Sequence, residues 1–160
     1  MSRGCFQYFL IPPDEQPVGK PWTAGPNLRL KHYISFSLEV IPDLKNRKNL
    51  SKHIQKDKEA ALILNKISST DRLFLFDEYG VSYKSIEFSR FLQKQMNSGI
   101  KQLVFVIGGP YGFSEELHKK AVGKISLSKM TFSHQMVRLF VLEQIYRGFT
   151  ILKNEPYHHQ

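Results

Sequence analysis

Two short, continuously apolar segments restrict the fold of this chain more than any other feature. Residues 72–77 read RLFLFD and residues 103–107 read LVFVI. Apolar runs of this length are typical of parallel strands that helices cover on both faces. Residues 77–80 predict a turn after the first run, and helical spacing of apolar side chains over 85–97 predicts a connecting helix. Strand, helix and strand in this order predict an α/β domain with a largely parallel sheet.

Further elements are predicted on either side of these strands. Residues 33–41 alternate between apolar and polar side chains, which indicates a half-buried strand. Amphipathic spacing predicts a helix over 51–67, and residues 133–148 form a helix so broadly apolar that we expect it to contact both the sheet and a partner subunit. Ser114, followed by two glutamates, predicts a helix N-terminus. Residues 124–127 are another strand candidate.

The first 29 residues differ from the rest in composition. They hold five of the eight prolines, at positions 12, 13, 17, 21 and 26, and show no sustained period. Such a segment is expected to be extended or poorly ordered, except for a possible short strand at 6–11. The length of 160 residues fits one domain. We therefore expect residues 1–29 to be an atypical proline-rich segment and residues 30–160 to form a single domain.

Charge and cysteine content limit the classes of function. Twenty-three lysines and arginines against 14 acidic residues give a formal charge of +9, which favours a nucleic-acid partner. An unspecialised basic surface is the alternative. Cys5 stands alone, so the chain offers neither an internal disulfide nor a thiolate zinc site, and we expect no bound metal. No apolar run has the length of a membrane span or a secretory signal, which predicts a cytoplasmic protein.

A glycine-rich turn follows the second apolar run, in the stretch VFVIGGPYGF over residues 104–113. A phosphate-binding P-loop needs Lys and then Ser or Thr after its second glycine, but Phe113 and Ser114 stand there. The glycines, at 108, 109 and 112, also lack the spacing of a dinucleotide fingerprint. Adjacent glycines still permit close approach of a ligand to the backbone, although an ordinary strand-to-helix turn is the alternative. Ligands of parallel sheets bind at the carboxyl ends of the strands, where Phe76 and Asp77 are expected to meet Gly108 and Gly109.

Several motifs together resemble one known family. They are the glycine turn, the apolar run before Asp77, ISLSKMTFSHQMVR at 125–138 and EQIYRGFTILKNEPYHH at 143–159. In order and spacing they resemble the ribosomal RNA large subunit methyltransferase H family, which belongs to the SPOUT class of enzymes. The resemblance runs from about Leu30 to the end of the chain.

The resemblance implies a SPOUT-type α/β fold, with a mainly parallel sheet flanked by helices and a C-terminal trefoil knot. It implies a homodimer that carries S-adenosyl-L-methionine near the subunit interface. The implied reaction is methylation of N3 of a pseudouridine in 23S rRNA, within the assembled ribosome. On this interpretation the glycine turn holds S-adenosylmethionine and not a phosphate.

The resemblance also implies site residues by position. Phe76 stands where the family usually has a leucine in the cofactor pocket. The complete implied cofactor-binding set is Phe76, Gly108, Leu127, Ser128, Lys129, Met130, Thr131 and Phe132.

The target N3 carries a proton that must leave, so a base or a polarising cation is expected nearby. Candidates for this catalytic role are His134, Arg138, Tyr157 and His158. Each has a structural alternative: Arg138 as an ion pair with Glu143 or with a partner chain, His134 as part of a helix cap, and the terminal pair as a frayed tail.

The N-terminus departs from the family pattern. The family opens with a short strand ending in Val-Gly-Lys and then a helix, and residues 1–29 supply neither in the expected place. One consequence would be a sheet without an edge strand and its covering helix. Two other functions therefore stay open: a non-catalytic basic α/β dimer that binds RNA or ribosomes, and a small-molecule enzyme on a flavodoxin-like sheet.

Overall fold

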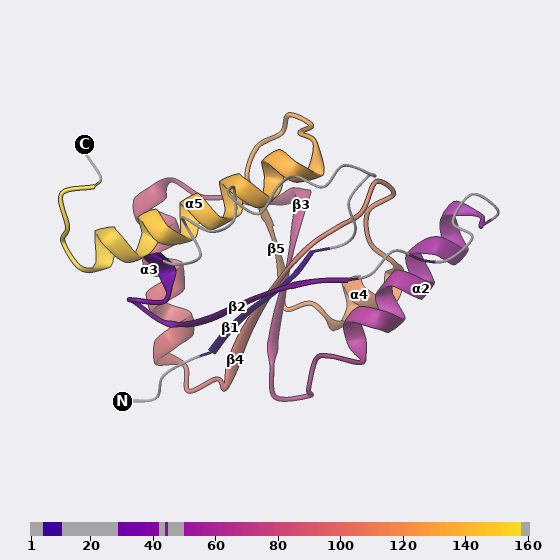
Figure 1. Ribbon diagram of the computed structural model, residues 1–160, viewed down its shortest axis with the longest axis horizontal. Coiled ribbons are helices and arrows are strands. Elements are labelled where there is room, and N and C mark those ends of the chain that lie inside the picture. The colour runs from indigo at the N-terminus through magenta and orange to yellow at the C-terminus, as the bar shows by residue number, and fades with distance from the viewer. Residues whose placement is uncertain (1–4, 11–28, 42–43, 45–49, 158–160) are drawn as a thin grey trace.

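The fold is a five-stranded parallel sheet between two pairs of helices (Figure 1). The computed structural model describes residues 5–10, 29–41, 44 and 50–157. The strands are β1 (Cys5–Leu10), β2 (Ser35–Val40), β3 (Arg72–Ser82), β4 (Gln102–Ile107) and β5 (Gly123–Ser126), in the spatial order β2-β1-β4-β3-β5. The helices are α2 (Lys52–Leu64), α3 (Ser85–Asn97), α4 (Glu115–Lys120) and α5 (His134–Leu152). The predicted α/β class and parallel sheet are confirmed.

The central strands are apolar on both faces because helices cover both faces. On one side α3 and α5 pack over a core formed in part by Phe74, Phe76, Leu103, Phe105 and Ile107. On the other side the intervening residues Leu73, Leu75, Val104 and Val106 share a second core with α2 and α4. Burying one such side chain stabilises a fold by roughly 1.5–3 kcal/mol. This alternation explains the continuous apolar runs in the sequence.

Strand β3 is longer than its apolar run, and the turn predicted at 77–80 is wrong. The chain stays extended to Ser82, but its pairing with β5 is irregular between Phe76 and Val81. The irregularity is held locally by Asp77, whose Oδ1 accepts a hydrogen bond of 2.9 Å from the backbone nitrogen of Tyr79. Residues 77–80 thus form a bulge inside a strand and not a turn that ends it.

The helices follow the predicted spacing with one clear exception. Helix α3 has the predicted bounds, and Ser114 caps α4 by accepting a hydrogen bond from the Leu117 backbone nitrogen. The predicted end of the last helix at Gly148 is wrong, since α5 continues to Leu152. A Cβ atom on residue 148 would lie 2.7 Å from Leu92 Cδ1 of α3, so the glycine permits close packing of two helices.

The N-terminal strand occupies an interior position in the sheet. The short strand predicted at 6–11 is confirmed as β1, which pairs in parallel with β2 on one side and with β4 on the other. The expectation of a sheet that lacks a strand here is therefore wrong. Residues 11–28, with all five N-terminal prolines, lie outside the described residues, and the division at residue 30 stays a prediction.

Tyr33 joins the segment before β2 to the end of α5. Its hydroxyl donates a 2.5 Å hydrogen bond to Glu155 Oε2, and its ring stacks on Phe149 with centroids 5.9 Å apart. Burial and the bond to Glu155 raise the pKa of Tyr33. The neutral phenol is thus favoured in the folded state, and its stabilisation is lost as the pH rises above the unfolded-state pKa of about 10.

We expect Tyr33→Phe to remove part of the alkaline loss of stability. The measurement is the free energy of unfolding by urea at several pH values between about 9 and 11. Tyr79→Phe, which removes the hydroxyl of an 84% exposed tyrosine, is the matched control. If the free energy of unfolding of Tyr33→Phe fell with pH as steeply as that of the wild type, the role given to this hydrogen bond would be contradicted.

Among the described residues, no helix combines the length and apolar character that crossing a bilayer requires.

Candidate cofactor and active site

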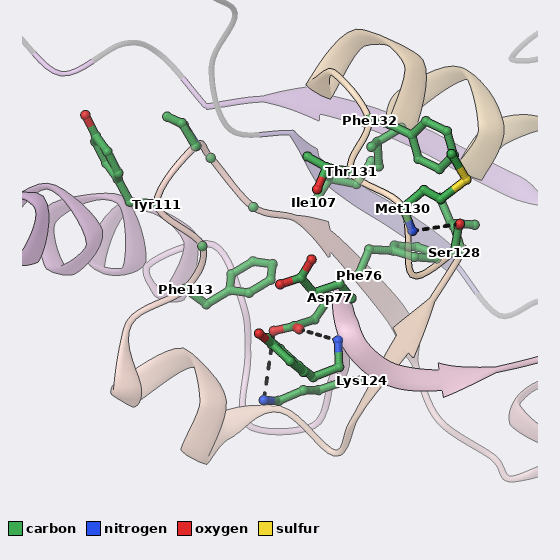
Figure 2. A pocket seen from close by; sticks show the side chains of 18 of the residues that line it. Phe76, Asp77, Ile107, Tyr111, Phe113, Lys124, Ser128, Met130, Thr131 and Phe132 are labelled. Carbon is green, nitrogen blue, oxygen red and sulfur yellow. Dashed lines mark hydrogen bonds and ion pairs between the residues drawn. The ribbon is translucent and has the colours of Figure 1, made fainter.

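A cavity of about 630 Å³ opens where β4 ends and the pairing of β3 becomes irregular (Figure 2). Its walls come from residues 76–79 of β3, the glycine turn after β4, and the loop 127–132 between β5 and α5. Single residues of α2, α4, β5 and α5 complete the lining. Elements distant in sequence meet here because parallel strands place their carboxyl ends at one edge of the sheet.

One end of the cavity is mainly apolar. Ile107 ends β4 here, Phe76 lies in β3 just before its irregular segment, and the loop 127–132 covers both residues (Figure 2). The loop is held locally by Ser128, whose hydroxyl accepts a hydrogen bond of 3.0 Å from the Met130 backbone nitrogen. The Phe132 ring packs edge-on against Phe140 of α5, with centroids 5.3 Å apart. A flat apolar group can enter between these walls.

Seven of the eight predicted cofactor-binding residues line this cavity: Phe76, Gly108, Leu127, Ser128, Met130, Thr131 and Phe132. The eighth, Lys129, is exposed and is not part of the lining.

The glycine turn forms the opposite wall. A Cβ atom on Gly108 would lie 3.0 Å from the ring of Phe113, which itself lines the cavity. Gly112 has φ of 74°, a conformation that glycine adopts without strain, and its nitrogen donates a 3.0 Å hydrogen bond to the Gly109 carbonyl oxygen. The turn thus needs glycine both for its own closure and for its approach to a buried ring.

The other end of the cavity is polar. Asp77 Oδ2 lies 3.9 Å from Lys124 Nζ, and Lys56, Glu78 and His118 also line this end. Burial, together with the charge of Lys124, lowers the pKa of His118, so its imidazole is neutral at neutral pH. The sequence does not predict these groups as cofactor-binding or catalytic residues. The position of Asp77, directly after a buried strand, indicates only that it lies near the ligand-binding edge of the sheet.

The predicted catalytic residues are distributed along α5 and its C-terminal extension. Arg138 follows Val137, a cavity-lining residue, and burial lowers the pKa of its guanidinium. The side chain of His134 and all of His158 lie outside what the structure describes.

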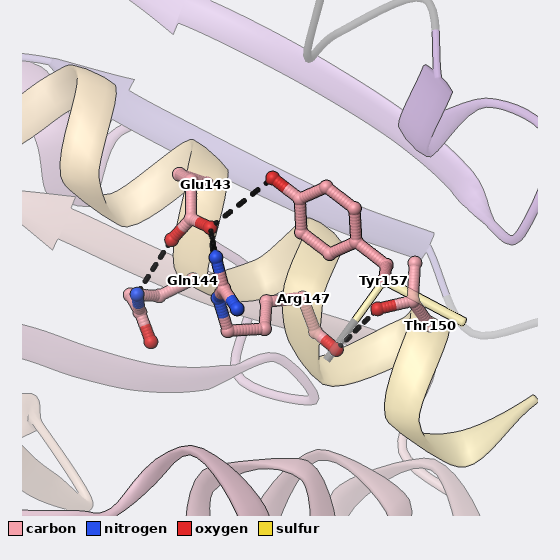
Figure 3. A network of polar contacts seen from close by, with 5 residues as sticks. All are labelled: Glu143, Gln144, Arg147, Thr150 and Tyr157. Carbon is pink, nitrogen blue, oxygen red and sulfur yellow. Dashed lines mark hydrogen bonds and ion pairs between the residues drawn. The ribbon is translucent and has the colours of Figure 1, made fainter. Parts of the chain in front are cut away.

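Tyr157, beyond the C-terminus of α5, joins a polar cluster on the C-terminal half of that helix (Figure 3). The Glu143 carboxylate accepts hydrogen bonds from Arg147 at 2.5 and 2.8 Å and from the Tyr157 hydroxyl at 3.4 Å. The Arg147 guanidinium also lies 4.8 Å from the centroid of the Tyr157 ring, and the Tyr146 ring packs against the same ring at 4.9 Å. These contacts order the chain as far as Tyr157, so fraying does not begin before it.

Tyr157 is placed relative to the cavity by its contact with Glu143. Val137 lines the cavity near the start of α5, and Tyr157 follows the last residue of the helix, Leu152, but turns back along it. A helix rises 1.5 Å per residue, so Glu143, which the Tyr157 hydroxyl contacts, lies about 9 Å along the axis from Val137. Tyr157 does not line the cavity of its own chain.

In the described part of the chain, no group of three or more His, Cys, Asp and Glu side chains is placed to hold a metal ion.

Comparison with known proteins agrees with the resemblance read from the sequence. A protein of Flavobacterium johnsoniae named ribosomal RNA large subunit methyltransferase H is 69% identical over 132 residues, which cover 82% of this chain and 84% of that protein. Proteins of the same name from Flavobacterium psychrophilum and Christiangramia forsetii are 69% and 63% identical over the same lengths. A family profile described as predicted SPOUT methyltransferase matches residues 26–158. The chain therefore belongs to the SPOUT methyltransferase family.

Proposed function

We propose that this protein is an S-adenosylmethionine-dependent methyltransferase that modifies N3 of a pseudouridine in 23S rRNA of the assembled ribosome. The observation that carries the proposal is the cavity, because it brings seven predicted cofactor residues together from three separate segments. The names of the relatives, each a ribosomal RNA large subunit methyltransferase, support the large-subunit substrate.

The cavity fits the proposed cofactor in size and in chemistry. Its volume of about 630 Å³ is in the range of small-molecule sites. The apolar end suits an adenine ring, with main-chain groups of the loop 127–132 available to read its edge. When bound, S-adenosylmethionine supplies an electrophilic methyl group on a sulfonium. The residues of the chain then have to bind the donor, exclude water and align the reacting atoms, because positioning accounts for much of the catalysis in such a displacement.

Removal of the N3 proton is assigned to groups near either end of α5. Arg138 follows the cavity-lining Val137 in sequence but does not itself line the cavity of its own chain. Its cation is the proposed group that polarises the uracil ring of the target. Tyr157 follows α5 and does not line the cavity of its own chain. We therefore infer that the Tyr157 acting at a cavity comes from a second copy of the chain, in the proposed homodimer.

Charge near the cavity supports an RNA substrate. Lys56 lines the cavity, and the Lys52 ammonium lies 5.4 Å from the centroid of the Tyr111 ring on the glycine turn. These lysines add to a formal charge of +9, which attracts a phosphate backbone whatever its sequence. Action on assembled ribosomes would put the enzyme in the cytoplasm.

The test is methyl transfer from labelled S-adenosylmethionine to ribosomes that lack the modification, with light scattering on the same sample. We expect one methyl group per ribosome, at N3 of a pseudouridine, from a dimer. A folded dimer that binds ribosomes without transfer, whether or not the donor is present, would favour the non-catalytic RNA-binding module. Transfer to a small molecule with no salt-sensitive RNA affinity would favour the small-molecule enzyme.

A further inference from the structure

The polar end of the cavity contains two opposite charges that each have room for another partner. The Asp77 carboxylate and the Lys124 ammonium are 3.9 Å apart, and their side chains are 14% and 36% exposed. Charge-assisted hydrogen bonds between such groups are normally about 2.7–2.9 Å long. The pair is therefore a loose ion pair at the edge of a cavity (Figure 2), and a ligand can donate hydrogen bonds to the carboxylate and accept them from the ammonium.

The Asp77 carboxylate is held in place by its own strand. Its Oδ1 accepts the 2.9 Å hydrogen bond from the Tyr79 backbone nitrogen, which fixes the bulge of β3. The second oxygen, Oδ2, faces Lys124 at the longer distance and can accept from a further donor. Lys124 comes from β5, the neighbouring strand, so both groups project from the sheet.

The chemistry of this end matches a zwitterion better than a phosphate. A phosphate would meet the carboxylates of Asp77 and Glu78 in the same lining, and like charges in a partly buried site repel. A simple cation would meet two lysines, Lys56 and Lys124. An α-amino acid group carries an ammonium and a carboxylate on one carbon, and so presents both charges over a few ångströms.

We propose that Asp77 binds the α-ammonium, and Lys124 the α-carboxylate, of the amino acid tail of the methyl donor. The inference rests on the proposed function and assigns the orientation of the donor: tail at the Asp77 and Lys124 end, adenosyl group against the loop 127–132. Because it contacts the tail, the site would bind the intact donor more tightly than nucleosides that share only its adenosyl part.

The test is calorimetric titration of the full chain with three ligands that differ in this tail. S-Adenosylmethionine carries both charges of the tail, and its decarboxylated form keeps the ammonium and the sulfonium but no carboxylate. 5′-Methylthioadenosine lacks the tail and, as a thioether, also the sulfonium charge. Hydrogen bonds to charged groups are strong enough that losing one should weaken binding by about tenfold to 100-fold. Asp77→Asn should lower the affinity for S-adenosylmethionine and its decarboxylated form by this factor, and leave 5′-methylthioadenosine within about twofold.

Lys124→Met gives the complementary result. It should lower the affinity for S-adenosylmethionine by about tenfold to 100-fold, so that the intact and decarboxylated donors bind alike, because the carboxylate of the intact donor then has no partner and the decarboxylated form has no carboxylate. Asp77→Asn keeps an Oδ1 that can accept the Tyr79 hydrogen bond, so the bulge is retained. Asp57→Asn, which removes the same charge from an exposed position of α2, is the matched control and should leave all three affinities unchanged.

The outcomes separate this inference from the function on which it rests. If the wild-type chain binds S-adenosylmethionine and 5′-methylthioadenosine equally well, the tail assignment is wrong while the cofactor site stands. If Asp77→Asn weakened the binding of S-adenosylmethionine and of 5′-methylthioadenosine by the same factor, the tail assignment would also be wrong, because Asp77 would then have a structural role. If the folded wild-type chain binds none of the three ligands, the proposed function fails and the tail assignment fails with it.

Discussion

Replacement of Gly80 by alanine is expected to destabilise the fold by about 3 kcal/mol, at the upper end of typical overpacking costs. A Cβ atom at this position would lie 2.6 Å from the backbone nitrogen and carbonyl carbon of Ile125 in β5. Backbone atoms of a paired strand cannot move aside as a side chain can, so β3 and β5 would have to separate. For a chain of this length, thermal unfolding should occur roughly 6–12 °C lower.

Gly148→Ala is the matched control for this prediction. Its Cβ atom would lie 2.7 Å from Leu92 Cδ1, the end of a side chain that can change rotamer. Alanine also favours a helix over glycine by about 1 kcal/mol, which offsets part of the contact. We expect Gly148→Ala to stay within about 1 kcal/mol of wild type. Equal destabilisation by both substitutions would contradict the distinction between backbone and side-chain contacts.

Gly108→Ala is expected to weaken binding of S-adenosylmethionine by about tenfold to 100-fold, the equivalent of a typical overpacking cost. The new methyl group would lie 3.0–3.3 Å from three atoms of the Phe113 ring. That ring is buried and lines the cavity, so its displacement would reshape the wall against which the donor binds. Calorimetric titration measures the affinity, and thermal unfolding of the same sample checks that the fold is intact.

Gly123→Ala provides the comparison for this second effect. It would place a methyl group 3.1 and 3.3 Å from two atoms of the Phe74 ring, a similar contact with a ring that does not line the cavity. We expect Gly123→Ala to change the stability of the fold about as much as Gly108→Ala does, and to change the affinity for S-adenosylmethionine much less. If both variants lost affinity equally, the effect would belong to general loosening of the sheet and not to the wall at Gly108.

The sequence predicts elements well where local spacing is sufficient. Helix α3 has its predicted bounds because Phe88 and Leu92 recur on one face that the core buries. The errors fall where the deciding contact is distant in sequence. Gly80 belongs to a bulge that depends on Ile125, and Gly148 lies within α5 because it meets Leu92 of another helix. Neither glycine differs locally from one that ends an element.

The sequence likewise predicts one part of the candidate site and not the other. The apolar wall and the glycine turn were expected, because family motifs mark the segments that form them. The polar end was missed, since Lys124, His118 and Asp77 come from β5, α4 and β3 and carry no shared motif. Only the order of parallel strands brings these side chains to one cavity.

The interior position of β1 has a consequence for the order in which the chain can fold. Its pairing of Cys5 with Gln102 is among the most non-local contacts of the sheet, and its other partner, β2, also follows it in the chain. A growing chain therefore carries this strand with one edge unpaired until β4 has been synthesised. Contacts so far apart require closure of a long loop, which slows folding. We expect completion of the sheet to be a late step, during which the newly made N-terminus is most exposed to aggregation.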